Sequence, residues 1–261
     1  MTIPIYQIDA FASKVFTGNY AAVCPLRRWL KDELLLGIAK ENNLPETAFI
    51  VQEGRGFHIR WFTPDIEMDL CGHATLASAH VIFNHLQYDK DEILFESSSG
   101  MLKAFKDEKY IWLDFPSRMP KKTAPVAIME QGMDRPPKET FKARDYVLVY
   151  EHEDDIIDLR PDKQILDQLN LDPGGIIVTA PGKEVDFVSR FFTPQSTIFE
   201  DPVTGSAHCS LIPFWAERLQ KTKMSAKQLS EREGTLACQL KGDRVLIGGK
   251  CVTYLKGEIY I

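Results

Sequence analysis

The chain has 261 residues, a formal net charge of −6 and a hydrophobic content of 44%. This length allows one large domain or two of ordinary size, and the composition is that of a soluble globular protein. Because the sequence has no basic run and no apolar stretch as long as a membrane span, neither nucleic acid nor a membrane is an expected partner.

The N-terminus and the cysteines indicate a cytoplasmic location. The first residues, MTIPIYQIDAF, lack the basic region and long apolar core of a secretory signal. The five cysteines are odd in number and scattered, and no C-x-x-C motif occurs. A reduced, cytoplasmic protein fits this usage best.

The first elements in chain order are expected to be a strand over residues 3–11, a turn at Gly18-Asn19, a second strand, and a helix over residues 31–41. Glu46 then opens a strand that continues with four apolar residues after Thr47. A carboxylate beside apolar material suits a proton-transferring acid or base. The alternative is an ordinary surface glutamate at the start of a strand.

A long motif follows and is repeated later. RWFTP at residues 60–64 leads through an acidic loop to Gly72 and an apolar run, and RFFTP at residues 190–194 leads in the same way to Gly205. The repetition, about 130 residues apart, predicts a duplicated unit of strand, loop and buried helix. Two helix N-termini of this kind offer free N–H groups to an anion such as a carboxylate. The alternative is a pair of tight turns whose glycines serve only packing.

The remaining elements complete two domains. The proline-rich segment 116–137 is the expected junction, so the predicted domains are residues 1–116 and 117–261, and the last strand is free to return to the first domain. A helix is expected over residues 162–169. Pro213 is expected to kink or shorten the second buried helix, and Gly248-Gly249 reads as a hairpin turn.

Six motifs together resemble the phenazine-biosynthesis PhzF-like family. They are IDAF at 8–11, FTGNYAAV at 16–23, ETAF at 46–49, RWFTP at 60–64, LCGHAT at 70–75 and EDPVTGSAH at 200–208. The resemblance covers essentially the whole chain. It implies an α+β fold similar to that of diaminopimelate epimerase: two pseudo-symmetric domains, each a β-barrel wrapped around a central α-helix, with the active site in the cleft between them.

The resemblance also implies roles for individual residues. Glu46 matches the catalytic acid/base of the family, and His73 and Asp201 match catalytic residues that position substrate and proton. Substrate-binding positions fall on Asn19, Gly72, Gly205 and Ser206. The characterised member isomerises a dihydro-hydroxyanthranilate without a cofactor, and relatives commonly form homodimers. A cofactor-independent homodimer is therefore expected here.

One departure from the epimerases concerns the residue before each helix-opening glycine. The epimerases use a cysteine at both positions, whereas this chain has Cys71 and Thr204. A threonine hydroxyl does not replace a thiolate without strong activation, so racemisation by two cysteines is disfavoured. Cys71 itself also fits a small, buried packing residue.

Metal chemistry is not expected from the sequence. His73 and His80 lie two turns apart, no acidic residue joins them at ligand spacing, and H-E-x-x-H is absent. His208 is expected to be a packing or hydrogen-bonding residue.

The sequence therefore predicts a cofactor-independent isomerase that moves a carbon-bound proton in a small carboxylate-bearing metabolite. Two alternatives stay open. One is an amino-acid epimerase or racemase in which Glu46 is one of two bases. The other is a non-catalytic small-molecule binding protein on the same scaffold. The substrate itself is not specified.

Overall fold

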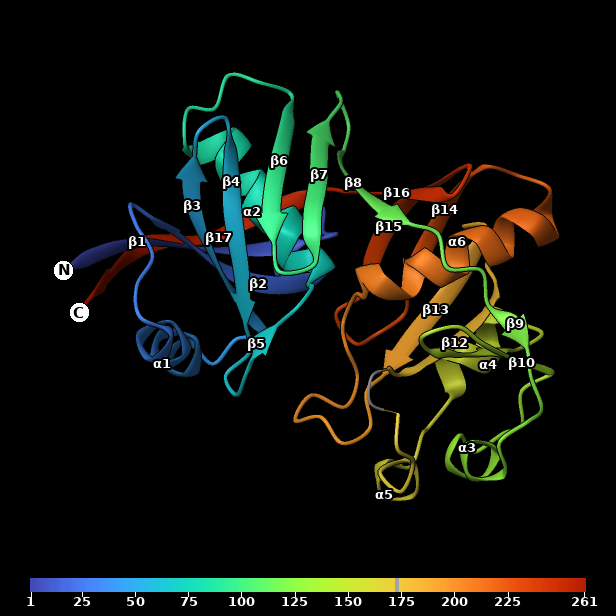
Figure 1. The fold of residues 1–261 in the computed structure, drawn as a ribbon. Coiled ribbons are helices and arrows are strands. Elements are labelled where there is room, and N and C mark those ends of the chain that lie inside the picture. The colour runs from blue at the N-terminus through green and yellow to red at the C-terminus, as the bar shows by residue number, and fades with distance from the viewer. Residues whose placement is uncertain (172–173) are drawn as a thin grey trace. The chain divides into compact units, whose positions relative to one another are not determined.

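The computed structural model describes residues 1–171 and 174–261, and the chain divides into two compact units (Figure 1). Unit 1 contains Met1–Phe115 and Leu246–Ile261, and unit 2 contains Pro116–Val245. The sequence-based division had its boundary at residue 116 and left the place of the last strand open. In the structure the last strand pairs with the first one.

Unit 1 consists mainly of strands around one long helix. Its elements are β1 (Thr2–Ala10), β2 (Asn19–Leu26), α1 (Asp32–Asn42), β3 (Glu46–Glu53), β4 (Gly56–Phe62), β5 (Glu67–Met68), α2 (Gly72–His85), β6 (Glu92–Ser97), β7 (Gly100–Lys106), β8 (Ile111–Pro116) and β17 (Cys251–Tyr260). β16 (Arg244–Gly249) carries the chain from unit 2 into unit 1. Helix α2 packs against β1, β2, β3 and β17. Ten of its side chains are buried, as the apolar sequence of this helix predicts.

Unit 2 repeats this plan. Its elements are β9 (Lys121–Lys122), α3 (Ala127–Gly132), β10 (Glu139–Lys142), β11 (Tyr146–Val149), α4 (Glu153–Asp158), α5 (Lys163–Leu166), β12 (Ile176–Pro181), β13 (Phe187–Phe192), α6 (Gly205–Leu219), β14 (Lys223–Gln228) and β15 (Gly234–Lys241). Helix α6 packs against β14 and β15. Its buried surface makes it the counterpart of α2.

The strand pairings show the duplication directly. In unit 1, β1–β2 is antiparallel, β2–β3 parallel, β3–β4 antiparallel, β4–β6 parallel and β6–β7 antiparallel. In unit 2, β10 to β15 pair in the same alternation of directions. The predicted fold of two pseudo-symmetric units, each with strands around a central helix, is confirmed.

The arginine of each R-x-F-T-P motif holds the loop that leads to the buried helix. Arg60 donates to both carboxylate oxygens of Glu67 at 2.7 and 2.6 Å, and Arg190 does the same to Glu200 at 2.7 and 2.9 Å. Each glutamate lies four residues before the N-cap of its helix, α2 or α6. A two-bonded arginine–carboxylate pair has a fixed geometry, so it sets the path of the chain into the helix.

Three local predictions were wrong. α6 is not shortened at Pro213 and runs from Gly205 to Leu219, because that residue is buried within a packed helix and tertiary contacts outweigh one lost hydrogen bond. The helix expected over residues 162–169 is only α5 (Lys163–Leu166), since the chain then tightens into turns bonded three residues apart. Gly248 and Gly249 lie inside β16 rather than in a turn, where a Cβ atom would meet the rings of Trp112 and Phe11.

Candidate active site

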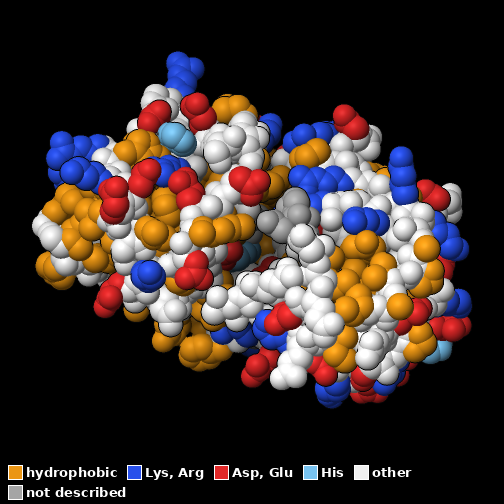
Figure 2. Space-filling view, turned by 60° about the horizontal axis from the view of Figure 1, so that its bottom comes forward, with side chains coloured by type: hydrophobic (Ala, Val, Ile, Leu, Met, Phe, Trp, Pro, Cys, Tyr) orange, Lys and Arg blue, Asp and Glu red, His pale blue; other side chains and the backbone are white. Residues whose placement is uncertain are grey.

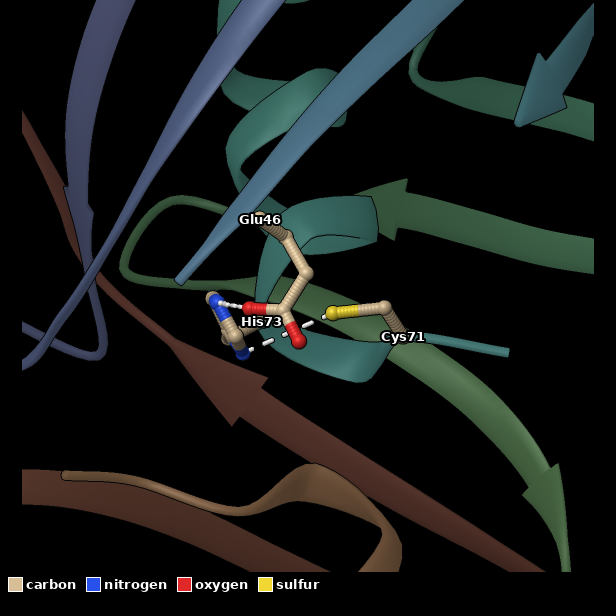
Figure 3. Close-up of side chains that lie close together, drawn as sticks. All are labelled: Glu46, Cys71 and His73. Carbon is tan, nitrogen blue, oxygen red and sulfur yellow. Dashed lines mark hydrogen bonds and ion pairs between the residues drawn. The ribbon is translucent and has the colours of Figure 1, made fainter. Parts of the chain in front are cut away.

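A cluster of polar side chains lies in unit 1 at the N-terminus of α2 (Figure 3). His73 Nε2 lies 3.0 Å from Glu46 Oε2. On the other side of the ring, His73 Nδ1 lies 3.1 Å from Asn19 Nδ2 and 3.6 Å from Cys71 Sγ. Three of these four are predicted site residues, and the structure brings them together from separate segments of the chain.

The topology explains why these residues meet. Because β2 and β3 are parallel and pair with Ala21 beside Glu46, both strands begin at the same end of the sheet. Asn19 is the first residue of β2, Glu46 is the first of β3, and His73 is in the first turn of α2. Since α2 packs against both strands, its N-terminus reaches the two strand starts.

Burial and charge decide the protonation of this cluster. Burial lowers the pKa of His73, but the neighbouring Cys71 and Glu46 groups raise it, and the net direction is well above the usual range. Burial raises the pKa of Cys71, and the Glu46 carboxylate adds to this. Cys71 is therefore a neutral thiol near pH 7, and the lasting partner of a protonated His73 is Glu46.

The members of the cluster differ in exposure and in hydrogen-bonding capacity. The side chain of Glu46 is 16% exposed and that of His73 only 5%, so the carboxylate is the more accessible of the two. A charged imidazole donates from both nitrogens, and a neutral one donates from only one. An asparagine amide offers both a donor and an acceptor, so rotation of the Asn19 amide serves either state of His73. Glu46 and His73 thus form an ion pair whose imidazole has a neighbouring amide suited to either of its protonation states.

The start of α6 in unit 2 holds a different network. The Thr204 hydroxyl donates to Asp201 Oδ2 at 2.5 Å, and the Thr204 amide donates to Gln228 Oε1 at 2.9 Å. Gln228 Nε2 in turn donates to the Asp201 carbonyl at 2.8 Å. This network fixes the turn that precedes α6. Gly205 and Ser206 are the first two residues of that helix.

The two helix starts share one further property. The N-cap residues Cys71 and Thr204 are both extended, and neither side chain caps its helix. The amides that open α2 and α6, beginning at Gly72 and Gly205, therefore keep donor capacity that a capping side chain would otherwise use.

Sequence reasoning missed two features of these sites. Gln228, fully buried at the end of β14, has no motif around it that could have revealed its role. The other feature is a donor set: the ligand atoms of Glu46, Cys71 and His73 all lie within 4.8 Å of one another. Carboxylate, thiolate and imidazole are zinc ligands. The expectation of no metal site rested on the spacing of the histidines, and such spacing does not reveal that Glu46 of β3 lies beside Cys71 and His73 at the start of α2.

The visible surface carries charges of both signs. On the face seen in Figure 2, acidic and basic side chains are interspersed rather than gathered by sign. Within residues 1–171 and 174–261, no helix combines the length and hydropathy that a membrane crossing requires.

Comparisons with known proteins agree with these observations. Residues 8–257 match the family model described as phenazine biosynthesis-like protein. The chain is 46% identical to an isomerase of Pseudomonas aeruginosa over 99% of both chains, and 43% identical to an isomerase of Halalkalibacterium halodurans over 100% of both. A crystal structure of a PhzF family protein from Enterococcus faecalis superposes with a TM-score of 0.97 at 46% identity and covers 100% of both chains.

A more distant structure shares only the fold. The hydroxyproline epimerase of Agrobacterium vitis superposes with a TM-score of 0.60 at 9% identity, over 99% of this chain and 92% of the epimerase.

Proposed function

This chain belongs to the phenazine biosynthesis-like PhzF family and is an isomerase, and from that premise we propose that it moves a carbon-bound proton within a small carboxylate-bearing metabolite. In this proposal Glu46 is the acid/base that takes the proton from carbon and returns it, and no cofactor takes part. The proposed substrate class is a small molecule that bears a carboxylate, and no particular compound is proposed.

One observation carries the proposal, the 3.0 Å contact between Glu46 Oε2 and His73 Nε2. A carboxylate held in place by an ion pair with a buried, protonated imidazole can accept a proton from carbon and return the same proton to the substrate. Asn19 supports the imidazole in either state. His73 is thus a positioning group behind Glu46 that supplies the opposite charge.

The proposed carboxylate-binding groups are the first amides of the two buried helices. Gly72 opens α2, and Gly205 and Ser206 open α6. A helix N-terminus attracts anions through free N–H groups and the helix dipole, and such fixed donors stabilise charge that builds up in a transition state. In this proposal Asp201, which precedes α6, orients the substrate and the proton.

The epimerase alternative is less well supported. It needs a second base beside Glu46, and Cys71 is the nearest candidate. Burial raises the pKa of Cys71, so the thiol is not the ready nucleophile or base that a low-pKa cysteine is. All five cysteines are free thiols, which agrees with the cytoplasmic location that we also propose.

Solvent exchange tests the proposal. The protein is incubated with candidate carboxylic and amino acids in deuterated water, and loss of carbon-bound proton signals is followed by NMR. Glu46→Gln keeps shape and polarity but accepts no proton, so exchange should fall at least about a hundredfold while ligand affinity stays near wild type. Glu53→Gln, at the other end of β3, is the matched control and should exchange normally.

Two results would change the assignment. Undiminished exchange in Glu46→Gln would remove Glu46 from the mechanism. Tight binding of a ligand by the wild type, without exchange of any of its protons, would favour the binding-protein alternative.

A further inference from the structure

The ionisable side chains at the start of α2 also form a set of metal donors. Figure 3 shows the Glu46 carboxylate, the Cys71 thiol and the His73 imidazole pointing toward one another. With one ligand atom taken from each residue, these atoms all lie within 4.8 Å of one another. The tetrahedral ligands of Zn²⁺ lie at about 2.0–2.3 Å from the metal and hence about 3.3–3.8 Å apart. The set therefore has to contract by only roughly 1 Å to surround the ion.

The donor types favour zinc over a hard cation. A thiolate, an imidazole and a carboxylate are ligands of Zn²⁺, whereas Mg²⁺ and Ca²⁺ prefer sites made of oxygen donors. Three protein ligands leave one tetrahedral position for a water molecule. The His73 ring has Asn19 beside Nδ1 at 3.1 Å and Glu46 beside Nε2 at 3.0 Å. Whichever nitrogen binds the metal, the other one keeps a polar neighbour, as is usual for a metal-bound histidine.

The charges balance when the metal is bound. Zn²⁺ binds a thiolate rather than a thiol, and it binds a ring nitrogen that carries no proton. The thiol proton of Cys71 and the proton on the coordinating nitrogen of His73 therefore leave to solvent. One thiolate and one carboxylate then cancel the two positive charges of the metal. The buried cluster thus carries no net charge and avoids the cost of an uncompensated one.

Unit 2 lacks these donors. By the strand pairs and the helix starts, the residues at the corresponding positions are Gly175, Thr204 and Ser206. None of these is a usual zinc ligand. Among residues 1–171 and 174–261, Glu46, Cys71 and His73 are the only group of three such donors close enough to share one metal ion. One ion per chain is therefore expected.

We propose that Glu46, Cys71 and His73 form a zinc site, and that Zn²⁺ bound there inhibits this protein. The side chain of Glu46 is 16% exposed and that of His73 only 5%, so the carboxylate is the ligand that an incoming ion reaches first. A carboxylate that binds Zn²⁺ is a much weaker base, because the charge of the metal stabilises the ionised form. The inhibition rests on the function proposed for Glu46, whereas the binding of zinc does not depend on it.

Direct binding measurements on the full-length protein, freed of metal with a chelator, test the site. In isothermal titration calorimetry, ZnCl₂ should bind once per chain with a Kd of about 1 μM or lower, and MgCl₂ should not bind. Co²⁺ in place of Zn²⁺ should give the near-ultraviolet charge-transfer absorption of a thiolate–cobalt bond. Cys71→Ser should abolish this absorption. Cys71→Ser and Glu46→Gln should each weaken zinc binding at least about tenfold.

Two matched variants control for metal binding elsewhere. Cys251 is the only one of the five cysteines that is not buried, and Glu53 lies at the other end of β3 from Glu46. Cys251→Ser and Glu53→Gln should bind zinc and cobalt as the wild type does. Far-UV circular dichroism establishes that each variant is folded.

The inhibition is measured on proton exchange in deuterated water. Zinc at about ten times its Kd should lower wild-type exchange about tenfold, since about nine-tenths of the sites are then occupied, and a chelator should restore it. No zinc binding up to about 100 μM, or binding that Cys71→Ser and Glu46→Gln leave unchanged, overturns the zinc site. Zinc bound at the site with undiminished exchange overturns the inhibition. Zinc binding in a wild type that exchanges no substrate proton supports the site and refutes the function proposed for Glu46.

Discussion

The two halves of this chain use the same framework to hold very different helix starts. Both have the same order of strand pairings and an arginine–glutamate pair before the buried helix. At the start of α2, His73 lies against the Glu46 carboxylate. At the start of α6, the side chain of Thr204 is engaged by Asp201 and Gln228. Duplication conserved the framework, and the proton-transfer chemistry that we propose resides in one copy.

The strand position that bears the carboxylate shows the difference most clearly. Thr47 pairs with Phe62 in unit 1, and Ile176 pairs with Phe192 in unit 2. The residue before each is Glu46 in one unit and Gly175 in the other. A Cβ atom on Gly175 would lie 2.4 Å from the Phe191 ring. Unit 2 therefore has no room for a side chain at the position where unit 1 has Glu46, the proposed acid/base.

The buried histidines show the same contrast. His208 donates from Nδ1 to the Thr204 carbonyl at 2.8 Å, and burial lowers its pKa to about 4 although that hydrogen bond raises it. It is therefore neutral at pH 7. His73 has a carboxylate beside it, and its pKa lies well above the usual range. The neighbouring group, carbonyl or carboxylate, determines the charge of each ring.

The largest expected difference is between the proton-exchange rates of variants at the two histidines, His73 and His208. His73→Asn should lower proton exchange at the substrate carbon by a hundredfold or more, since Glu46 loses the charged partner that positions it. His208→Asn, the matched control in unit 2, should lower it less than tenfold. Exchange rates by NMR, with circular dichroism to verify folding, measure both. Equal losses in the two variants would mean that the contrast between the units has no catalytic meaning.

The neutral His208 should weaken the fold in acid. Its folded pKa of about 4 lies below the unfolded value of about 6.5. The unfolded state therefore binds a proton first, and stability present above pH 6.5 is lost as the pH falls toward 4, by about 3 kcal/mol. His208→Gln should show a smaller loss over this window in urea unfolding. His73 contributes with the opposite sign, because its raised pKa stabilises the fold below pH 6.5 and this contribution fades at higher pH. An acid dependence identical in wild type and His208→Gln would contradict the burial effect.

The smallest effect is expected at Cys71. A neutral thiol at the N-cap of α2 packs and contacts His73 without carrying the proton, so Cys71→Ser should keep exchange within about tenfold of wild type. Cys209→Ser, a buried site one residue beyond His208 in α6, is the matched control for folding. A loss beyond a thousandfold in Cys71→Ser alone would make the thiol a base and would support the epimerase alternative.

Much of the framework was visible in the sequence because it depends on repeated local signals. The two R-x-F-T-P motifs, the acidic residues after them and the apolar runs after Gly72 and Gly205 predict two strand–loop–helix units, and the structure has both. Glu46 could be singled out because it stands at the start of an apolar strand. Each of these signals lies within a short stretch of chain.

The contacts that make the site depend on packing between distant segments, which no local pattern reports. Asn19 and His73 are 54 residues apart, and their contact follows from the parallel pairing of β2 with β3 and the position of α2. Gln228 reaches Thr204 only because β14 lies beside α6. The predicted shortening of α6 at Pro213 was wrong for a related reason. The cost of one lost hydrogen bond can be read from the local sequence, whereas the packing that offsets it depends on distant residues.

The arginine–glutamate pairs have a consequence for how this scaffold can diversify. Glu67 follows Arg60 by seven positions and Glu200 follows Arg190 by ten. Both ion pairs nevertheless form, and each helix begins five residues after its glutamate. The ion pair thus joins the two ends of a loop whose length and sequence can vary. Because the entropy of closing a loop grows only slowly with its length, three extra residues can be accommodated there without displacing the helix. New loops can therefore be inserted between the arginine and the glutamate of each pair, while the amides that open α2 and α6 stay in place.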